Sequence, residues 1–402
     1  MLPEKFVLAE RVLQVAPSPT LAVNAKAKAL RAAGADILNF SVGEPDMTTP
    51  AHVCEAGKQA IDDGHTRYTP VAGIVELREA ICAKLKKDQG WEYEPDQVQV
   101  CCGGKHGLFN IFQAILNPGD EVLIPAPYWV SYPPMVQLAG GTPVIVPLKE
   151  ENNFDFDPEV LAQYVTPKTK AIVLNSPSNP TGAVFSQESL AAVGKMAYEK
   201  GWLVITDDMY EEISYIDGKL PHILHAIPRL RDQIVLSNGV SKSFAMTGWR
   251  IGWSIGPSQI IKAMNKIQSQ STSNPAAPSQ YAALAALTGP QDFPKQLLEA
   301  FIPRRAYFVE ALRAIPNVTC VNPMGAFYVF PNFSAYYGKT FNGQVIDGSL
   351  ALADYLLSEA NVASVPGAAF GSDDFIRFSF ATSMDVIKEG MERITTALAA
   401  LQ

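Results

Sequence analysis

The stretch SNGVSKSFAMTGWRIGW, residues 237–253, places Lys242 among small and apolar residues directly after a β-branched run, and Arg250 follows eight positions later. Desolvation disfavours a charged ammonium group and lowers its pKa, so a lysine in this setting can serve as an amine nucleophile toward an aldehyde. Most of the 32 lysine and arginine side chains must be solvated surface groups. The apolar surroundings of Lys242 favour a role as a nucleophile over a solvated position on the surface.

Short β-branched runs alternate with helical stretches around this segment, which predicts an α/β protein with a mainly parallel sheet. AIVLN (171–175) and WLVIT (202–206) are apolar on both alternate faces, as expected of strands that helices cover on both sides. We expect strands at residues 97–102, 121–124, 144–146, 171–175, 203–206, 234–237 and 251–255.

The pattern changes after Pro294 to longer amphipathic stretches around a few strands, notably GAFYVF (325–330) and FIRFSF (375–380). This mixture is typical of a smaller α+β domain, and a chain of 402 residues exceeds the size at which a single core usually stops growing. The arm at the N-terminus is expected to pack against the smaller domain or a partner subunit. We predict an N-terminal arm that is also part of the small domain (1–47), a large domain (48–290) and a small C-terminal domain (291–402).

The composition narrows the classes of partner and site. A net charge of -8 without long acidic or basic runs gives no sign of a nucleic-acid surface or a polybasic membrane anchor, so small molecules are the expected partners. Glu4 and Lys5 interrupt the apolar segment that a signal peptide needs, and no stretch approaches ~20 apolar residues, which predicts a cytoplasmic protein. Five cysteines without CxxC spacing, and scattered histidines, favour buried free thiols over disulfides, zinc or a catalytic metal.

Ser241, Lys242 and Arg250 together resemble the SK-x(7)-R signature of the class I and II aminotransferases of the aspartate aminotransferase fold. Further motifs resemble those of the family and stand in its order: SVGEPD (41–46), TRYTPVAG (66–73), CGGKHG (102–107), PYWVSY (127–132), NPTG (179–182), DDMY (207–210) and FIRFSFAT (375–382). The resemblance covers essentially the whole chain. It implies a fold type I transferase that depends on pyridoxal phosphate, with a large domain on a mainly parallel sheet and a smaller α+β domain.

The resemblance implies that pyridoxal 5′-phosphate is the cofactor and that Lys242 holds it as a Schiff base. Asp207 ends a strand, where its carboxylate can pair with a protonated pyridine nitrogen and keep the ring an electron sink; capping a following helix is the alternative role. Tyr210 would lie on the same side of that helix and share the cofactor's phenolic oxygen with Asn179. Trp129 resembles the aromatic residue that stacks on the ring. Core packing is the alternative for both Tyr210 and Trp129.

The segment VQVCCGGKHGLFNIFQ (98–113) should run from a strand through a glycine turn into a helix, where backbone amides and a positive helix end can bind a phosphate. A plain tight turn or a Rossmann loop is the alternative, although the GxGxxG order and the expected acidic residue are missing. Tyr68 resembles the family tyrosine that reaches this phosphate from the neighbouring subunit, which implies a homodimer with shared active sites. The residues predicted around the phosphate are Gly103, Gly104, Lys105, Ser241, Arg250 and Tyr68.

Arg377 lies in the middle of an apolar run, so it needs a compensating anion. A substrate α-carboxylate would provide one, and an internal salt bridge is the alternative. The resemblance implies that the Gly43 amide assists Arg377, and that Lys105, with Thr20 as its companion, recognises the distal carboxylate as in the bacterial and plant branch. The residues predicted to contact the substrate are Gly43, Trp129, Asn179, Arg377, Lys105 and Thr20.

Two positions depart from family patterns. Ser269 stands where the animal-type aspartate enzymes carry an arginine for the distal carboxylate, and Gly239 stands where many relatives have serine in SxSK. Because Lys105 resembles the alternative distal-carboxylate residue, dicarboxylic substrates stay favoured.

The resemblance implies an aminotransferase that moves an amino group between aspartate, or glutamate, and 2-oxoglutarate or oxaloacetate by a ping-pong mechanism. Lys242, Asp207 and Tyr210 are the predicted catalytic residues, with Lys242 carrying a proton to and from the substrate's Cα. Similarity to plant-type bifunctional enzymes, notably in NFSAYYG (332–338) and ATSMDV (381–386), makes prephenate an alternative substrate. Transfer from another amino acid, a lyase or synthase on the same cofactor, a cofactor-sensing regulator and a nicotinamide dehydrogenase are the competing functions.

Overall fold

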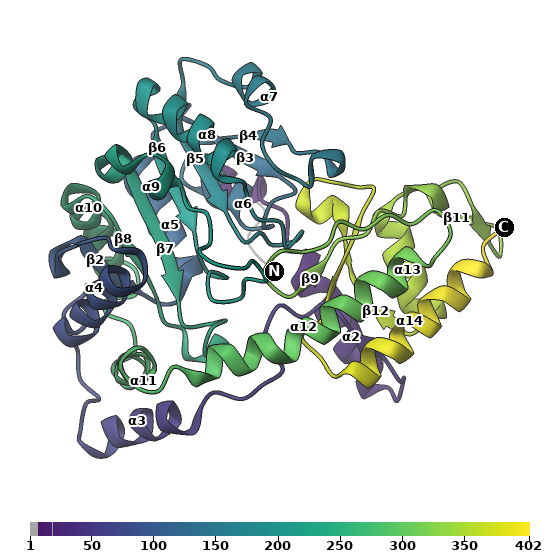
Figure 1. Ribbon diagram of the computed structural model, residues 1–402, viewed down its shortest axis with the longest axis horizontal. Coiled ribbons are helices and arrows are strands. Elements are labelled where there is room, and N and C mark those ends of the chain that lie inside the picture. Colours follow the sequence, from purple (N-terminus) through teal and green to yellow (C-terminus); the bar gives the residue numbers. More distant parts are fainter. Residues whose placement is uncertain (1–6, 18) are drawn as a thin grey trace.

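The computed structural model describes residues 7–17 and 19–402, so Glu4, Lys5 and Ser18 lie outside the described residues. Its central feature is a seven-stranded sheet in which β3 to β7 run parallel, while β8 is antiparallel to both β7 and β2 (Figure 1). Across the sheet the strands are β2 (Val98–Cys101), β8 (Gly252–Ile255), β7 (Ile234–Gly239), β6 (Leu203–Asp207), β5 (Thr169–Asn175), β3 (Glu121–Ala126) and β4 (Thr142–Pro147). The predicted α/β class, the mainly parallel sheet and the seven strand positions are confirmed.

Both faces of this sheet are buried. On β5, Ile172 and Leu174 belong to one apolar cluster, whereas Ala171 and Val173 belong to another. Strands covered by helices on both sides need apolar residues on both alternate faces, which is the pattern that the sequence carries. The helices of this part of the chain are α3 (Ala51–Asp62), α4 (Val75–Gln89), α5 (Gly104–Ile115), α6 (Tyr132–Leu138), α7 (Pro158–Gln163), α8 (Gln187–Lys200), α9 (Ile223–Ala226), α10 (Ser258–Ser269) and α11 (Ala277–Thr288).

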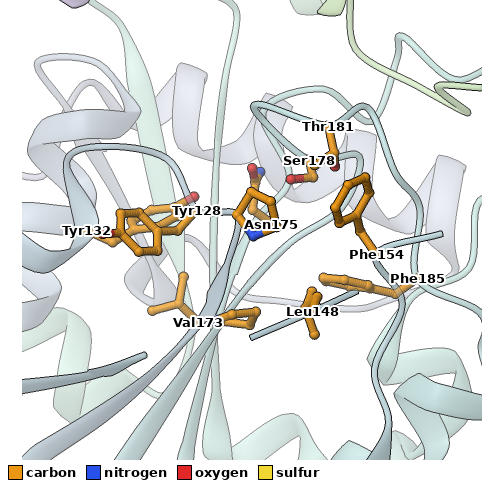
Figure 2. Close-up of a pocket in the computed structure, with 11 residues that line it drawn as sticks. Tyr128, Tyr132, Leu148, Phe154, Val173, Asn175, Ser178, Thr181 and Phe185 are labelled. Carbon is orange, nitrogen blue, oxygen red and sulfur yellow. The ribbon is translucent and has the colours of Figure 1, made fainter. Parts of the chain in front are cut away.

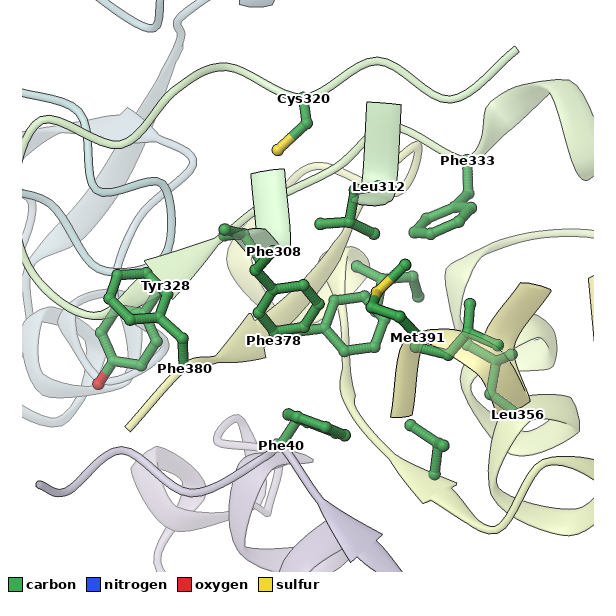
Figure 3. Close-up of a cluster of buried hydrophobic side chains, with 14 of the residues drawn as sticks. Phe40, Phe308, Leu312, Cys320, Tyr328, Phe333, Leu356, Phe378, Phe380 and Met391 are labelled. Carbon is green, nitrogen blue, oxygen red and sulfur yellow. The ribbon is translucent and has the colours of Figure 1, made fainter. Parts of the chain in front are cut away.

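The C-terminal elements form a second apolar core. β14 (Ile376–Ser379) lies between β13 (Val365–Pro366) and β9 (Tyr328–Val329) in a small antiparallel sheet, so both expected C-terminal strands are present, though shorter than the runs that predict them. The long α12 (Asp292–Arg313) leads from α11 to these strands, where α14 (Met384–Ala399) packs against it and α13 (Ser349–Glu359) packs against α14 (Figure 1). The core is rich in aromatic side chains, including Phe40, Phe308, Phe378 and Phe380 (Figure 3).

The N-terminal segment is more regular than the arm that the sequence pattern suggests. It contains α1 (Glu10–Leu13) and a 14-residue helix, α2 (Pro19–Ala32). β1 (Leu38–Asn39) then pairs in parallel with β12 (Val362–Ala363), and Lys26 of α2 forms an exposed ion pair with Asp354 at 2.7 Å. Residues 19–39 therefore pack against the C-terminal elements. The sequence analysis expected the arm to pack either there or against a partner subunit.

The remaining elements are short. β10 (Thr340–Phe341) and β11 (Gln344–Val345) form a hairpin, and 3₁₀ turns cover Pro95–Gln97, Glu150–Asn152, Pro228–Gln233, Thr247–Trp249, Ser334–Tyr336 and Gly367–Phe370. No described helix combines the length and the apolarity that crossing a membrane requires. All five cysteines are free, but only Cys101 and Cys320 are buried; Cys54, Cys82 and Cys102 are half-buried, so the expectation of buried thiols holds in part.

Candidate active site

A cavity of about 320 Å³ lies where β5 and β6 end, between the seven-stranded sheet and the C-terminal elements. Open α/β sheets bind their ligands outside the carboxyl ends of the strands, so this is the expected place for a site. The predicted residues that line it are Thr20, Gly43, Gly104, Lys105, Trp129, Asn179, Asp207, Tyr210, Ser241, Lys242, Arg250 and Arg377. The lining residues that the sequence analysis did not name are Leu108, Val130, Asn175, Met209, Thr247 and Tyr328.

Asp207 is the last residue of β6, as predicted, and its side chain is buried. Tyr132 donates a hydrogen bond to its Oδ2 at 2.7 Å, and the side-chain amide of Asn175 donates to the Asp207 carbonyl oxygen at 2.8 Å. Burial raises the pKa of the Asp207 carboxyl to about 6, although the hydrogen bond from Tyr132 opposes that effect. Because no described cation pairs with it, this carboxylate suits a ligand that brings a protonated nitrogen.

No helix begins directly after Asp207, which corrects the expectation for the DDMY segment. Residues 209–212 form turns instead, and the Asp208 carbonyl oxygen accepts a hydrogen bond from the Glu211 amide at 3.0 Å. Glu211 and Glu212 bind the Lys84 ammonium of α4 at 3.0 and 2.6 Å. These ion pairs hold the segment against α4 in a non-helical conformation. Asp207 therefore has no helix to cap.

Tyr210 reaches the cavity from one of these turns. Its hydroxyl lies 2.9 Å from the hydroxyl of Tyr328 on β9, and both side chains are buried. Burial raises the pKa of Tyr210 well above its ordinary value, so the phenol stays protonated and able to donate a hydrogen bond.

Lys242 lies three residues beyond the end of β7 and lines the cavity, where its Nζ donates to the Gly43 carbonyl oxygen at 2.5 Å. Burial lowers the pKa of Lys242 to about 8; Glu44 opposes this change, and the positive charges of Arg250 and Arg377 add to it. A substantial fraction of this amine is therefore neutral near physiological pH, as a nucleophile or a proton acceptor requires.

The glycine turn after β2 faces Arg250. Gly103 has a φ of +86°, and a Cβ added there would lie 2.6 Å from Nη2 of Arg250, so the guanidinium occupies the space that glycine leaves. Gly104 begins α5, whose first backbone amides have no partner within the helix. Ser241 is buried at the same cavity. The helix end and Arg250 together offer hydrogen-bond donors and positive charge to a phosphate.

Lys105 extends over Trp129, with its Nζ 4.9 Å from the ring centroid. Burial, and secondarily the charge of Arg250, lowers the pKa of Lys105. No described acidic side chain forms an ion pair with it, and the buried Oγ1 of Thr20 at the same cavity also has no described hydrogen-bond partner. An ammonium and a hydroxyl without partners suit a carboxylate ligand.

Arg377 is buried on β14, and the alternative of an internal salt bridge does not hold among the described residues. Its Nη1 donates to Oδ1 of Asn179 at 3.0 Å, and its Nη2 donates to the Ser41 carbonyl oxygen at 2.8 Å. Both acceptors are neutral, so the positive charge of the guanidinium stays uncompensated inside the protein and favours binding of an anion.

Two predicted residues lie outside the cavity lining. Gly103 sits directly behind Arg250, as its close approach to that guanidinium requires. Tyr68 is 91% exposed, so its hydroxyl does not reach the cavity of its own chain.

Tyr132 and Asn175 were missed by the sequence analysis, although signals for both exist. Tyr132 belongs to the PYWVSY motif, and Asn175 is a polar residue at the end of an apolar strand, in register with Asp207. Behind them lies a second cavity of about 20 Å³, which Figure 2 shows between Tyr132, Asn175 and the turn that carries Ser178 and Thr181. It has room for about one water molecule, so the larger cavity is the one for a substrate.

The departure at Gly239 has a steric reason. Gly239 pairs with Gly252 across β7 and β8, and a Cβ added at Gly239 would lie 2.9 Å from the Gly252 Cα and 3.0 Å from the Ile251 carbonyl oxygen. A serine at this position would require the two strands to move apart.

The donor set fits an aromatic aldehyde that carries a phosphate. Lys242 offers an amine, Asp207 a buried carboxylate for a cationic ring nitrogen, and Trp129 a ring face, while α5 and Arg250 offer an anion site. Thr20 Oγ1, which has no hydrogen-bond partner among the described residues, and Arg377, which has no acidic partner among them, can then bind two carboxylates of a second ligand.

The chain is similar over nearly its whole length to one group of known proteins. A family model described as "Aminotransferase class I and II" matches residues 35–394. The "Aspartate aminotransferase" of Geobacillus stearothermophilus is 48% identical over 388 residues, which cover 96% of this chain and 98% of that protein. The "Aspartate/prephenate aminotransferase" of Cereibacter sphaeroides is 49% identical over 397 residues, covering 98% and 99%. A solved aspartate aminotransferase from Thermus thermophilus with maleate has a TM-score of 0.92 at 42% identity, covering 98% of this chain and 100% of that one.

Proposed function

The chain belongs to the class I and II aminotransferases, and on that premise we propose how its cavity performs the reaction. The protein is a pyridoxal-phosphate-dependent aminotransferase that moves an amino group between aspartate, or glutamate, and 2-oxoglutarate or oxaloacetate. One observation carries the site assignment: an amine, Lys242, shares a cavity with two cationic side chains, Arg377 and Lys105, that have no described acidic partner.

The cofactor's place follows from the donor set. We propose that Lys242 holds the aldehyde carbon, Asp207 the ring nitrogen, Tyr210 and Asn179 the phenolic oxygen, and Trp129 one face of the ring. When bound, pyridoxal phosphate supplies an electron sink for the negative charge that develops at the substrate's Cα. The proposed phosphate ligands are Ser241, Arg250, the amides of Gly104 and Lys105, and Tyr68 of a second subunit. The Gly103 amide, which the sequence analysis also placed here, instead donates to the Cys101 carbonyl oxygen at 2.7 Å.

Lys242 is the proposed proton carrier at the substrate's Cα. Its pKa of about 8 keeps a usable fraction of the amine neutral at physiological pH, and the same group can return the proton as an ammonium. Asp207 and Tyr210 are buried, so their hydrogen bonds act in an environment of low dielectric constant. The first 2-oxo acid leaves before the second enters, which gives ping-pong kinetics.

The two cations account for dicarboxylic substrates. We propose that Arg377, assisted by the Gly43 amide, binds the α-carboxylate, and that Lys105 and Thr20 bind the distal one. Prephenate also carries two carboxylates, and two of the relatives compared above are named for aspartate transamination while one is named for both aspartate and prephenate. Prephenate transamination is therefore the second candidate activity.

Lys105→Met is expected to lower kcat/KM for aspartate about 30- to 100-fold, the range expected for one charge-assisted hydrogen bond to a carboxylate. The kcat/KM for alanine should change less than threefold, because alanine has no distal carboxylate. Steady-state assays with both donors, and with prephenate as acceptor, measure this selectivity. Methionine keeps the backbone amide of residue 105, and Lys262→Met, on the exposed side of α10, serves as the matched control. An equal loss for aspartate and alanine would contradict the distal-carboxylate role.

We propose that the active form is a homodimer in which Tyr68 of each chain completes the phosphate site of the other. Tyr68 is 91% exposed in the single chain, so its ring is free to contact a second subunit. Sedimentation should give twice the chain mass of 43.6 kDa. Tyr68→Phe should weaken cofactor affinity about tenfold and leave the dimer intact, since one hydrogen bond to a charged group is lost. A monomer with full cofactor affinity would contradict both statements.

The domain limits and the compartment are also proposals. Residues 48–290, which include the seven-stranded sheet, form the proposed large domain, and 291–402 form the small one together with part of 1–47. Most buried apolar residues of the two parts belong to different clusters, which supports this division, and a smaller cluster that joins Phe154 and Ala183 to Phe330 and Phe375 lies at the contact between them. Free cysteines and a net charge of -8 without basic runs support a cytoplasmic protein.

A further inference from the structure

Arg377 has an unusual environment for a buried arginine. Its residue is 2% exposed, no described acidic side chain pairs with it, and its Nε has no described hydrogen-bond partner. Buried charges ordinarily have an ionic partner, since desolvation of an unpaired charge is costly. Its two hydrogen bonds, to Asn179 and to the Ser41 carbonyl oxygen, are both to neutral acceptors, so other contacts matter for the position of the charged group.

Two aromatic rings lie against this guanidinium. Its Cζ is 4.6 Å from the centroid of the Tyr328 ring and 5.0 Å from that of the Phe370 ring. Aromatic faces attract cations within about 6 Å, most strongly where water is excluded. Unlike a carboxylate, a ring neither neutralises the charge nor competes for the N–H groups that a substrate carboxylate would use.

Both rings are themselves fixed. Tyr328 lies on β9, which pairs with β14 beside Arg377, and its hydroxyl is 2.9 Å from that of Tyr210. Figure 3 shows its ring at the edge of the aromatic core, with the hydroxyl pointing away from the other labelled side chains. Phe370 is fully buried and meets Phe330 edge-on at 5.9 Å.

The Tyr328 hydroxyl end also adjoins the substrate side of the cavity. A Cβ added at Gly43 would lie 2.8 Å from the Tyr328 hydroxyl oxygen, so only glycine allows this approach. Gly43 in turn accepts the hydrogen bond of Lys242. Tyr328 is thus in contact with Tyr210 and close to Gly43, besides facing Arg377.

We propose that Tyr328 and Phe370 are positioning residues that clamp Arg377 between two ring faces, so that the guanidinium stays fixed and fully charged for a substrate carboxylate. This inference rests on the proposed role of Arg377 in binding that carboxylate. Ordinary core packing is the competing explanation, because both rings also belong to apolar clusters. Core packing predicts loss of stability and of cofactor affinity together, whereas the clamp predicts a selective loss of carboxylate affinity.

The test uses the enzyme loaded with cofactor and maleate, an unreactive dicarboxylate. We expect Tyr328→Leu and Phe370→Leu each to weaken maleate binding about 30-fold, equivalent to about 2 kcal/mol at 1.36 kcal/mol per tenfold change, the value for a desolvated cation–π contact. Tyr328→Phe keeps the ring and should stay within threefold of the parent. Tyr198→Leu removes a ring that lies 4.2 Å from Arg229 near the surface and is the matched control.

Three measurements separate the explanations: maleate affinity by calorimetry, cofactor affinity by absorbance titration, and the split between KM and kcat for aspartate. The clamp predicts weaker maleate binding and a raised KM for both leucine variants, with cofactor affinity kept within threefold. Equal losses of maleate and cofactor affinity, or a Tyr328→Phe variant as weak as Tyr328→Leu, would overturn it. Arg377→Leu tests the role of Arg377 itself. If this variant binds maleate as tightly as the parent, the proposed function of Arg377 is wrong. If it loses maleate affinity while the Tyr328 and Phe370 variants keep theirs, only the clamp is overturned.

Discussion

Lys242→Ala is expected to lower kcat for aspartate by at least about 10⁴-fold, because it removes both the amine that holds the cofactor and the group that moves the proton at Cα. Lys242 is the only lysine besides Lys105 among the residues that line the described cavity, and Lys105 lies over Trp129 rather than near Gly43. A single-turnover assay and the absorbance of bound cofactor measure the two losses separately.

Lys266→Ala, an exposed lysine on α10, is the control for loss of a surface charge and should behave as the parent. Added methylamine offers a second check, because a small free amine can enter the space left by the missing side chain and restore part of the proton transfer. A Lys242→Ala variant with the parent's absorbance and normal turnover would refute the assignment.

Asp207→Asn should have the second largest effect, a fall in kcat of about 10³-fold, because the amide keeps the shape but cannot neutralise a cationic ring nitrogen. The variant should bind cofactor more weakly for the same reason. Asp217→Asn, at an exposed position, is the matched control. Activity within tenfold of the parent would show that the charge of Asp207 is not needed.

Although Asp207→Asn should lower activity, we expect it to stabilise the protein without cofactor. Burial raises the pKa of Asp207 from 3.8 to about 6, so the folded state disfavours the ionised form. Its contribution to stability is therefore fully present below pH 4 and is lost as the pH rises through 6. Asp207→Asn should raise the free energy of unfolding by about 3 kcal/mol at pH 7.5 but only by about 0.6 kcal/mol at pH 4, because a difference of one in pKa between the folded and unfolded states corresponds to about 1.36 kcal/mol. Urea unfolding at both pH values measures the difference.

The sheet was readily predicted because its signals are local. Seven apolar runs have the length and composition of buried strands, and all seven form the sheet. The glycine turn at Gly103 and the strand end at Asp207 were equally visible, since each depends on a few neighbouring residues.

The segment after Asp207 was predicted wrongly for a physical reason. Its three-residue spacing suits a helix, but Glu211 and Glu212 bind Lys84, more than 120 residues away in the chain. A tertiary ion-pair cluster therefore overrides the local pattern. The helix α2 was missed for a different reason: nearby prolines suggested an irregular arm where the structure has a helix.

The sequence by itself determined the family, the order of the strands along the chain and the identity of most residues that line the cavity. Each of these depends on short motifs that can be recognised from a few neighbouring residues. Only the tertiary structure decided which groups meet. Arg377 contacts Asn179 and the Ser41 carbonyl, 198 and 336 residues away, and lies against the ring of Tyr328. The depressed pKa of Lys242 and the raised pKa of Asp207 likewise arise from burial, which is a property of the assembled fold and not of any segment.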